Sequence, residues 1–288
     1  MIFYEPSYQA AFRQKGVVVI KNGLDRTALS QLRAGYDRFA NKRTKRSESS
    51  DGSGFHSTIF ESNIAQRKAV HRCIRPLIEP LLQSYLAGYH PALCTFANKT
   101  ARDPSGEVPI HQDWSFVDES KFTSLGLWCP LVDVDSQNGC LHIVQGSHRR
   151  ATLLRAACTP FLYPQLIPTL YEQYLTAVPM KAGDIILFDN RLFHCSFPNW
   201  SDQDRTAATA VLIPNHSRLM YYHAPDPYYP HRIERFEVED DFYLQHPEGE
   251  RPQQATSLGM CSSSGKLGSV DRNSLKKGDR GRGTKAGV

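Results

Sequence analysis

Six short runs of apolar and β-branched residues between residues 91 and 215 constrain the fold of this chain more than any other feature. Turn-forming residues separate the runs, as in Asp103-Pro104-Ser105-Gly106 and Gln137-Asn138-Gly139. One inserted segment, about 159–175, has a helical pattern instead. Many short strands joined by such turns predict a mostly β fold, a sandwich or barrel-like jelly roll with flanking helices. The expected strands cover residues 92–99, 108–114, 124–131, 140–144, 184–188 and 206–213.

Helical patterns precede this strand region. Residues 1–90 are expected to be mostly helical, with one β-branched strand at 16–20. A long helical pattern over 64–86 contains Pro76 and Pro80. Because proline lacks the backbone N–H and clashes with the preceding turn, we expect these two residues to break or kink the helix.

Three segments lack a regular pattern. Residues 42–54 are charged and rich in Ser and Gly, which favours a flexible loop. Within an aromatic C-terminal segment at 216–247, residues 220–231 are crowded with Tyr, His and Pro, which favours an ordered irregular loop over a strand. Residues 248–288 contain few apolar side chains, so we expect a disordered basic tail, because too little surface is buried to offset chain entropy. We therefore predict a single domain over 1–247 with a jelly-roll core at 91–215.

The net charge of +5 belongs to the end of the chain. Residues 251–288 contain eight Lys/Arg and two Asp/Glu, so the rest is close to neutral and nothing calls for a nucleic-acid partner. No apolar run approaches the roughly 20 residues of a membrane span. The N-terminus lacks a secretory pattern, and the seven cysteines contain no CxxC pair. We expect a cytoplasmic protein with reduced thiols and a small-molecule partner, of unspecified oligomeric state.

A candidate metal site lies in the run at 108–114, which contains His111-Gln112-Asp113. In a strand, residues i and i+2 point to the same face, so His111 and Asp113 can converge on one ion. The pattern is weak by itself, since the two residues could also form a structural hydrogen-bonded pair. His194 follows the buried run at 184–188 and offers a third ligand. Two imidazoles and one carboxylate on one side of a metal form the facial triad of non-haem Fe(II) oxygenases.

Arg205 strengthens this interpretation. It follows His194 by eleven residues, after the turn-rich stretch 199–204, and that spacing suits a hairpin. The hairpin would place Arg205 on the strand beside the one leading to His194. Because a guanidinium binds a carboxylate with a fixed fork of N–H groups, the residues predict a metal-bound keto acid whose far carboxylate is held by Arg205.

Because these motifs follow one another in this order along the chain, the chain resembles the phytanoyl-CoA dioxygenase family of Fe(II)/2-oxoglutarate oxygenases over about residues 10–225. The resemblance implies a double-stranded β-helix, with His111, Asp113 and His194 as Fe(II) ligands and Arg205 as the partner of the distal carboxylate of 2-oxoglutarate. Gln145 stands where the family usually has proline. The matching segments are His111-Gln112-Asp113, 128–133 (WCPLVD), 138–148 (NGCLHIVQGSH), Gly183-Asp184, His194-Cys195-Ser196 and Arg205.

The resemblance also implies a cosubstrate pocket and a reaction. Ser196 and Trp128 occupy positions that line this pocket, and Thr95 and Lys99 fall where family members also contact 2-oxoglutarate. Fe(II), 2-oxoglutarate and O2 would together oxidise an aliphatic C–H, with release of succinate and CO2. Because the carboxylate of Asp113 is present, hydroxylation or a related oxidation is favoured over halogenation.

No motif identifies the substrate pocket. The candidate substrate contacts are Trp114, Phe116, Arg191, Tyr221 and His223. Each also has an ordinary structural explanation: core packing for the aromatic residues, an ion pair for Arg191 and a solvent-exposed position for His223. The polar, aromatic stretch favours a natural-product or amino-acid-like substrate.

Two other functions fit the same residues. A cupin-like hydrolase or isomerase could use the two histidines and the aspartate to bind zinc or manganese, although it would have no need of Arg205. A non-catalytic jelly-roll binding protein is also possible, although it would have no need of three ligands and a carboxylate partner.

Overall fold

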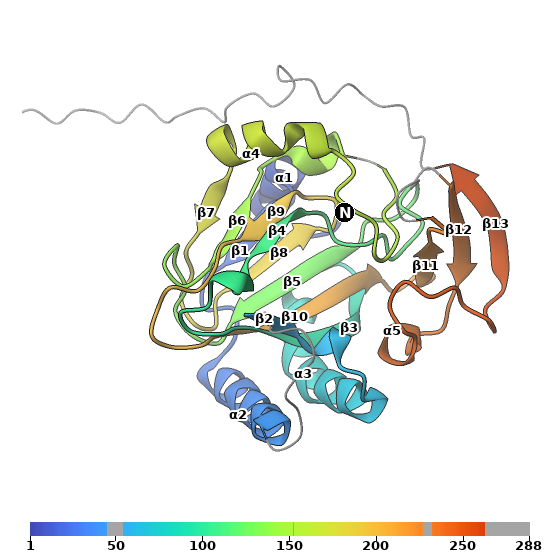
Figure 1. The fold of residues 1–288 in the computed structure, drawn as a ribbon. Helices are drawn as coiled ribbons and strands as arrows, with labels where there is room; N and C mark the ends of the chain where they lie inside the picture. Colours follow the sequence, from blue (N-terminus) through green and yellow to red (C-terminus); the bar gives the residue numbers. More distant parts are fainter. Residues whose placement is uncertain (45–53, 152, 227–231, 263–288) are drawn as a thin grey trace, which may run out of the picture.

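Two antiparallel sheets stack on one another at the centre of the molecule (Figure 1). The computed structural model describes residues 1–44, 54–151, 153–226 and 232–262. The larger sheet has the order β1-β8-β5-β10-β3-β2 and comprises Val17–Ile20, Ile185–Asp189, Leu125–Pro130, Arg205–Pro214, Tyr89–Lys99 and Phe55–Ser57. The smaller sheet has the order β4-β9-β6-β7 and comprises Val108–His111, His194–Ser196, Leu141–Ile143 and Thr176–Val178. This arrangement confirms the predicted jelly roll with flanking helices.

Side chains alternate between the two faces of each strand, and the two faces of the larger sheet belong to different hydrophobic cores. On β10, Ala208, Ala210 and Leu212 belong to the core beneath the helices, whereas Ala207 belongs to the core between the two sheets. Successive side chains of a strand point to opposite faces, so Arg205 and Thr209 share the face of Ala207. The space between the sheets therefore receives polar groups from β10, although the strand is apolar on its other face.

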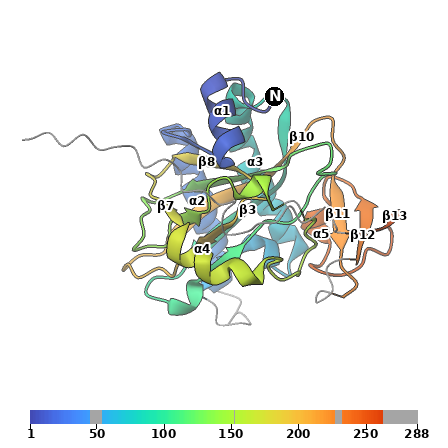
Figure 2. The same cartoon turned by 90° about the horizontal axis from the view of Figure 1, so that it is seen from above.

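Helices α2 (Arg26–Thr44) and α3 (Ile64–Tyr85) cover the outer face of the larger sheet (Figure 1), and α1 (Pro6–Lys15) lies near the end of α3 (Figure 2). Helix α3 continues through Pro76 and Pro80, so of the predicted break or kink the break is wrong and the kink stays a prediction. Its buried face packs into the core beneath the sheet, and this packing offsets the local cost of proline. The buried residues of this face include Ile74, Ile78, Leu81 and Leu82.

The helix predicted for the insertion is shorter than expected. The segment forms a 3₁₀ turn and then α4 (Ile167–Gln173), which lies above the smaller sheet in Figure 1. The remaining 3₁₀ turns are η1 (Thr58–Phe60), η2 (Pro104–Gly106) and η3 (Ser147–Arg149), while η4 (Pro164–Leu166) is the one that precedes α4.

A third, three-stranded sheet stands beside the sandwich (Figure 1). It consists of β11 (Met220–His223), β12 (Arg232–Glu237) and β13 (Ser257–Ser262), and a short helix, α5 (Phe242–Gln245), lies between β12 and β13 in the chain. The prediction of an irregular loop at 220–231 is therefore wrong for β11.

The predicted disorder from residue 248 onward is wrong as far as residue 262. β13 obtains its backbone hydrogen bonds from β12, with Ile233 opposite Cys261. The side chain of Glu234 also accepts hydrogen bonds from Arg251 at 2.7 Å and from Ser257 at 2.6 Å. A segment with few apolar residues can be ordered in this way, because its partners come from another part of the chain.

Three predicted features fall wholly or partly outside the described residues. These are most of the 42–54 loop, the centre of the aromatic segment at 227–231, and the chain after residue 262. Among the helices that the structure does describe, none has the length and apolar character needed to cross a membrane.

Candidate metal centre and its cavity

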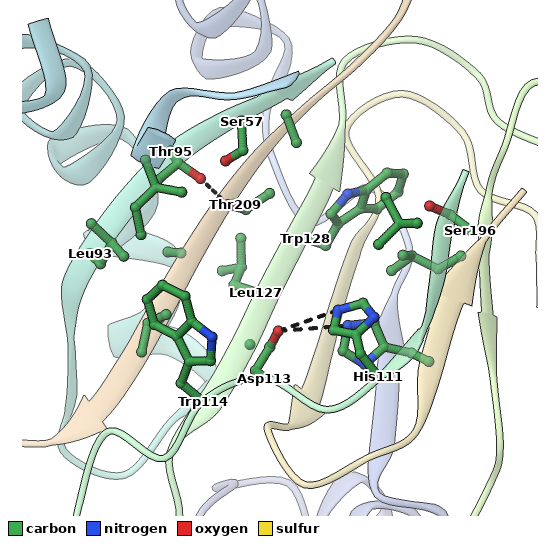
Figure 3. Close-up of a pocket in the computed structure, with 18 of the residues that line it drawn as sticks. Ser57, Leu93, Thr95, His111, Asp113, Trp114, Leu127, Trp128, Ser196 and Thr209 are labelled. Atoms are coloured by element: carbon green, nitrogen blue, oxygen red, sulfur yellow. Dashed lines mark hydrogen bonds and ion pairs between the residues drawn. The ribbon is translucent and has the colours of Figure 1, made fainter. Parts of the chain in front are cut away.

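The side chains of His111, Asp113 and His194 meet between the two sheets. The Nε2 atoms of His111 and His194 lie 3.9 Å and 3.7 Å from the same Oδ1 atom of Asp113. The two imidazole ring centroids are 4.2 Å apart, and the three candidate ligand atoms lie within 4.8 Å of one another. In Figure 3 the Asp113 carboxylate faces both rings. One metal ion could therefore be shared by all three side chains.

Strand pairing brings the two histidines together. His111 ends β4 and lies directly opposite His194, which begins β9, so their side chains project from the same side of the small sheet. The strand predicted over 108–114 ends at His111, and Asp113 belongs to the irregular segment that follows. His111 and Asp113 do converge as predicted, but the irregular segment after β4 brings Asp113 there, not the alternation of side chains along a strand.

Backbone carbonyls orient both imidazoles. The Nδ1 atom of His111 lies 2.8 Å from the carbonyl oxygen of Pro109, and the Nδ1 atom of His194 lies 3.0 Å from that of Leu192. A carbonyl oxygen only accepts, so each Nδ1 carries the proton and each Nε2 presents a lone pair to the centre. Desolvation by the surrounding protein, together with the adjacent His194, lowers the pKa of His111 to about 4, which keeps this ring neutral near pH 7.

A buried ion pair holds the segment that carries Asp113. The guanidinium of Arg155 donates two hydrogen bonds to the carboxylate of Glu119, at 2.8 Å and 2.5 Å, and its Nε donates to the carbonyl oxygen of Asp113 at 2.7 Å. The side chains of Arg155 and Glu119 are 4% and 7% exposed. The backbone N–H of Ser115 also donates to the carbonyl oxygen of Arg155. These contacts determine where the Asp113 carboxylate lies.

Replacing Glu119 with glutamine should weaken both the fold and the metal site. The substitution leaves the buried Arg155 without its counter-charge, and breaking such a pair costs about 3–5 kcal/mol. Displacement of the Asp113 backbone should lower metal affinity about tenfold, as is typical for groups that support metal ligands. Thermal unfolding and Co(II) titration of the folded protein measure the two effects. Glu79→Gln, which removes an exposed i,i+4 partner of Arg75, is the matched control and should change neither.

Arg205 reaches the same space from the opposite sheet, so the predicted hairpin is wrong. It begins β10 in the larger sheet, where it pairs with Lys99 of β3, whereas His194 begins β9 in the smaller sheet. The strand that leads to His194 is β8, whose edges are occupied by β1 and β5, and both edges of β9 are occupied by β4 and β6, so β10 lies beside neither strand. The chain therefore crosses between the sheets at 197–204, and Arg205 approaches the triad from across the sandwich.

Among the described residues, no anionic group pairs with the buried guanidinium of Arg205. The residue is 2% exposed, and its Nε and Nη1 atoms have no hydrogen-bond acceptor among the described residues. Its Cζ atom lies 5.4 Å from the centre of the Trp128 ring. Burial lowers the pKa of Arg205 to about 10. A buried cation with free donors is costly by itself, so this arrangement fits an anionic ligand such as a carboxylate.

The triad and Arg205 line one cavity of about 380 Å³ between the sheets. In Figure 3, Trp128 and Ser196 lie on one side of His111, and Trp114, Leu93 and Thr95 lie on the side of Asp113 away from it. Five of the other predicted contacts line this cavity: Ser196, Trp128, Thr95, Trp114 and Phe116. A space of this size accommodates a small cosubstrate and part of a small organic substrate.

Lys99, a predicted cosubstrate contact, does not line the cavity. Its buried ammonium donates hydrogen bonds to the carbonyl oxygens of Ser196 and Phe197, both at 2.9 Å, and to that of Gly106. Burial and the neighbouring Arg205 lower its pKa to about 7. In this position Lys99 connects β3 to the end of β9, and its contact with a cosubstrate stays a prediction.

Three predicted substrate contacts also lie elsewhere. Arg191 forms a two-point ion pair with Asp189, at 2.8 Å and 2.6 Å, which matches its structural explanation. Tyr221 lines a smaller adjoining cavity, and its hydroxyl donates to the carbonyl oxygen of Glu250. His223, at the end of β11, lines neither cavity.

Several cavity residues were missed by the sequence analysis. Thr209 forms a 2.6 Å hydroxyl–hydroxyl hydrogen bond with Thr95, and its position four residues after Arg205 on one strand face could have indicated it. Gln112 lines the cavity and donates to the carbonyl oxygens of Ala151 and Arg191. Glu248 also lines the cavity, although it lies at the start of the segment that was expected to be a disordered tail.

Comparison with known proteins identifies relatives of this chain. The family model described as phytanoyl-CoA dioxygenase (PhyH) matches residues 12–207, more than half of the chain. The phytanoyl-CoA dioxygenase of Arabidopsis thaliana is 36% identical over 110 residues, which are 38% of this chain and 39% of that protein. The phytanoyl-CoA dioxygenase domain-containing protein 1 homolog of Dictyostelium discoideum is 32% identical over 123 residues, 40% and 44% of the two chains. The alignments thus span about two fifths of these relatives.

Solved structures share the fold. The non-heme alpha ketoglutarate dependent carbocyclase SnoK from nogalamycin biosynthesis superposes with a TM-score of 0.55 at 20% identity, over 90% of this chain and 96% of that one. HygX from Streptomyces hygroscopicus, with nickel and 2-oxoglutarate bound, gives a TM-score of 0.52 at 16% identity, over 74% and 88%. At these identities the likeness concerns the fold, and it confirms the predicted double-stranded β-helix.

Proposed function

Because the chain belongs to the phytanoyl-CoA dioxygenase family, we propose that it is an Fe(II)- and 2-oxoglutarate-dependent dioxygenase. Its reaction would hydroxylate, or otherwise oxidise, an aliphatic C–H of a small metabolite. One observation carries the proposal: a triad of two histidines and one aspartate shares a cavity with a buried arginine that has no anionic partner in the described part of the chain.

The residues present fit the implied cofactors. His111, Asp113 and His194 would hold Fe(II) through two neutral imidazoles and one carboxylate oxygen, a donor set that this metal accepts. Arg205 would hold the distal carboxylate of 2-oxoglutarate through the two donor atoms that have no acceptor among the described residues. When bound, iron with 2-oxoglutarate and O2 supplies the oxidising power for C–H cleavage.

The protein's own residues would orient the reactants and exclude water. The Trp128 ring lies against the Arg205 guanidinium, shielding this charge from solvent, so that its pairing with a carboxylate is strengthened. The carbonyls of Pro109 and Leu192 hold the imidazole rings in place. On the other side of the triad, Trp114 and Leu93 would keep the reacting C–H in an apolar environment.

A turnover experiment tests this function against its alternatives. Purified protein with Fe(II), 2-oxoglutarate and O2 should release succinate, slowly without a substrate and faster with one. Omitting O2 or replacing Fe(II) with Zn(II) should abolish succinate release, because neither condition supports oxidation. Release that persists with Zn(II) under nitrogen, or no release under any condition, would favour the hydrolase, isomerase or binding-protein alternative.

The setting of the reaction is also a proposal. Natural-product or amino-acid-like metabolism is supported by the fold neighbours, of which SnoK is from nogalamycin biosynthesis. A cytoplasmic location is supported by the seven cysteines, all of which are free thiols. The carboxylate of Asp113 supports hydroxylation or a related oxidation rather than halogenation.

A further inference from the structure

Two buried cations, Lys99 and Arg205, form a cation pair beside the cavity. Lys99 ends β3 and Arg205 begins β10, and the two residues are directly opposite each other in the larger sheet. Directly opposite residues share one face of a sheet, with Cβ atoms about 5 Å apart. Lys99 is 0% exposed and Arg205 is 2% exposed. Like charges in this arrangement repel each other, and burial strengthens the repulsion because water cannot screen it.

No carboxylate of the described residues pairs with this cation pair. The Lys99 ammonium donates to backbone carbonyls, which carry no net charge, and two donor atoms of Arg205 have no acceptor. Glu107 attracts Lys99 from a distance, but its side chain is exposed, so water weakens the attraction. The thiols of Cys140 and Cys195 are nearby, and burial raises the pKa of both, so neither carries a charge near pH 7. The pair therefore keeps an uncompensated positive charge.

The ammonium of Lys99 is held in one place. Its Nζ donates to the carbonyl oxygens of Ser196 and Phe197, both at 2.9 Å, and also to that of Gly106. Gly139 has a φ of 79°, and a Cβ atom there would lie 2.9 Å from the Cδ atom of Lys99, so a glycine is needed to leave room for the lysine stem. The side chain of Ser196 lines the cavity on the same side of His111 as Trp128 (Figure 3). The charge of Lys99 is thus fixed behind the backbone of a cavity residue.

We propose that Lys99 is a second cation for the distal carboxylate of 2-oxoglutarate: Arg205 binds this carboxylate directly, and Lys99 attracts it from behind Ser196. An anion at this end of the cavity lowers the repulsion within the cation pair and is attracted by both members. Because the surrounding protein excludes water, the attraction extends over several ångströms and requires no contact. This inference deepens the proposed function and rests on it.

Two keto acids distinguish the effect of charge from the effect of structure. 2-Oxoglutarate and 2-oxopentanoate share the keto-acid group, but the second has a methyl group in place of the distal carboxylate. Calorimetry measures their binding to protein loaded with Mn(II), at a pH of about 6.5, which is below the pKa of about 7 that Lys99 has in the protein. The ratio of the two dissociation constants gives the preference for the distal carboxylate. A structural defect should weaken both ligands alike, whereas the loss of a charge should weaken 2-oxoglutarate alone.

Lys99→Gln and Lys99→Met both remove the charge. The glutamine keeps an N–H donor for the carbonyls and the methionine keeps the length of the stem, so at least one variant is expected to fold, and thermal unfolding shows which. Each folded variant should lower the preference for 2-oxoglutarate about tenfold and leave the affinity for 2-oxopentanoate nearly unchanged. Lys121→Met is the matched control, because Lys121 is an exposed lysine that pairs with Asp118, and its loss should leave the preference unchanged.

Two results would overturn the inference. One is an unchanged preference for the distal carboxylate in a folded Lys99 variant. The other is an equal loss of affinity for both keto acids, which would assign Lys99 a structural role at the end of β9.

Succinate release separates a failure of this inference from a failure of the proposed function. Fe(II)- and O2-dependent release, combined with a preference that does not depend on Lys99, would leave the dioxygenase assignment intact and remove the second cation. A Lys99-dependent preference in a protein that releases no succinate would support the two-cation site and contradict the dioxygenase assignment.

Discussion

Asp113→Ala is expected to abolish 2-oxoglutarate turnover. The substitution removes the anionic member of the triad, whose Oδ1 lies within 4 Å of both histidine Nε2 atoms. Two neutral imidazoles would remain, with no charge to compensate a divalent ion, so metal affinity should fall by at least the 10–100-fold that is typical even for supporting residues. Succinate release should become undetectable, and metal analysis of the purified protein should show little iron.

The control for this experiment is a surface aspartate. Asp202 is exposed and pairs with Arg102, so Asp202→Ala should bind metal and turn over 2-oxoglutarate like the unmodified protein. The fold should survive Asp113→Ala, because the carboxylate belongs to the cavity wall and the segment is held through the Asp113 carbonyl, which the substitution keeps. Normal turnover by Asp113→Ala would rule out the triad as the metal site.

Arg205→Ala should raise the KM for 2-oxoglutarate by two orders of magnitude or more while leaving metal binding nearly unchanged. The substitution leaves the distal carboxylate of the cosubstrate without its buried cationic partner, at a cost of about 3–5 kcal/mol. Every 1.4 kcal/mol of binding free energy changes the dissociation constant by a factor of ten. Arg205→Lys keeps the charge without the planar fork and should give an intermediate KM. Steady-state succinate formation measures KM, and Co(II) titration measures metal affinity.

Arg102 provides the matched control for Arg205. It is an exposed arginine in the segment that follows β3, and it pairs with Asp202 of the crossing at 197–204, so Arg102→Ala should leave the KM unchanged. An unchanged KM in Arg205→Ala would remove the proposed role of this arginine, even if the triad still bound metal.

Local features of the sequence predicted the strand-rich core and the metal ligands. Apolar and β-branched runs bounded by turn residues are local features, so β3, β5, β8 and β10 were expected close to where they lie. The pattern His111-Gln112-Asp113 indicated two ligands that do meet. Its structural basis differs, however, because β4 ends at His111 and the Asp113 backbone is held by Arg155, 42 residues later in the sequence.

The sequence analysis did not anticipate features that depend on contacts with residues far away in the sequence. Pro76 and Pro80 remain inside α3 because the sheet packs against the buried face of that helix. β13 exists because β12 supplies its hydrogen bonds. Arg205 faces the triad from across the sandwich, because neighbouring strands occupy both edges of β9. No pattern within a short window of sequence contains these partners.

The amino-acid sequence by itself determined which chemical groups the protein has for a metal and a keto acid, because ligand type and spacing are local properties. The tertiary structure alone decided which charges are left without a partner. Arg205 lines the cavity between the sheets, and whether its charge is satisfied depends on atoms far from it along the chain. The physical reason is that burial makes an unpaired charge costly, and burial exists only once the two sheets have closed over it.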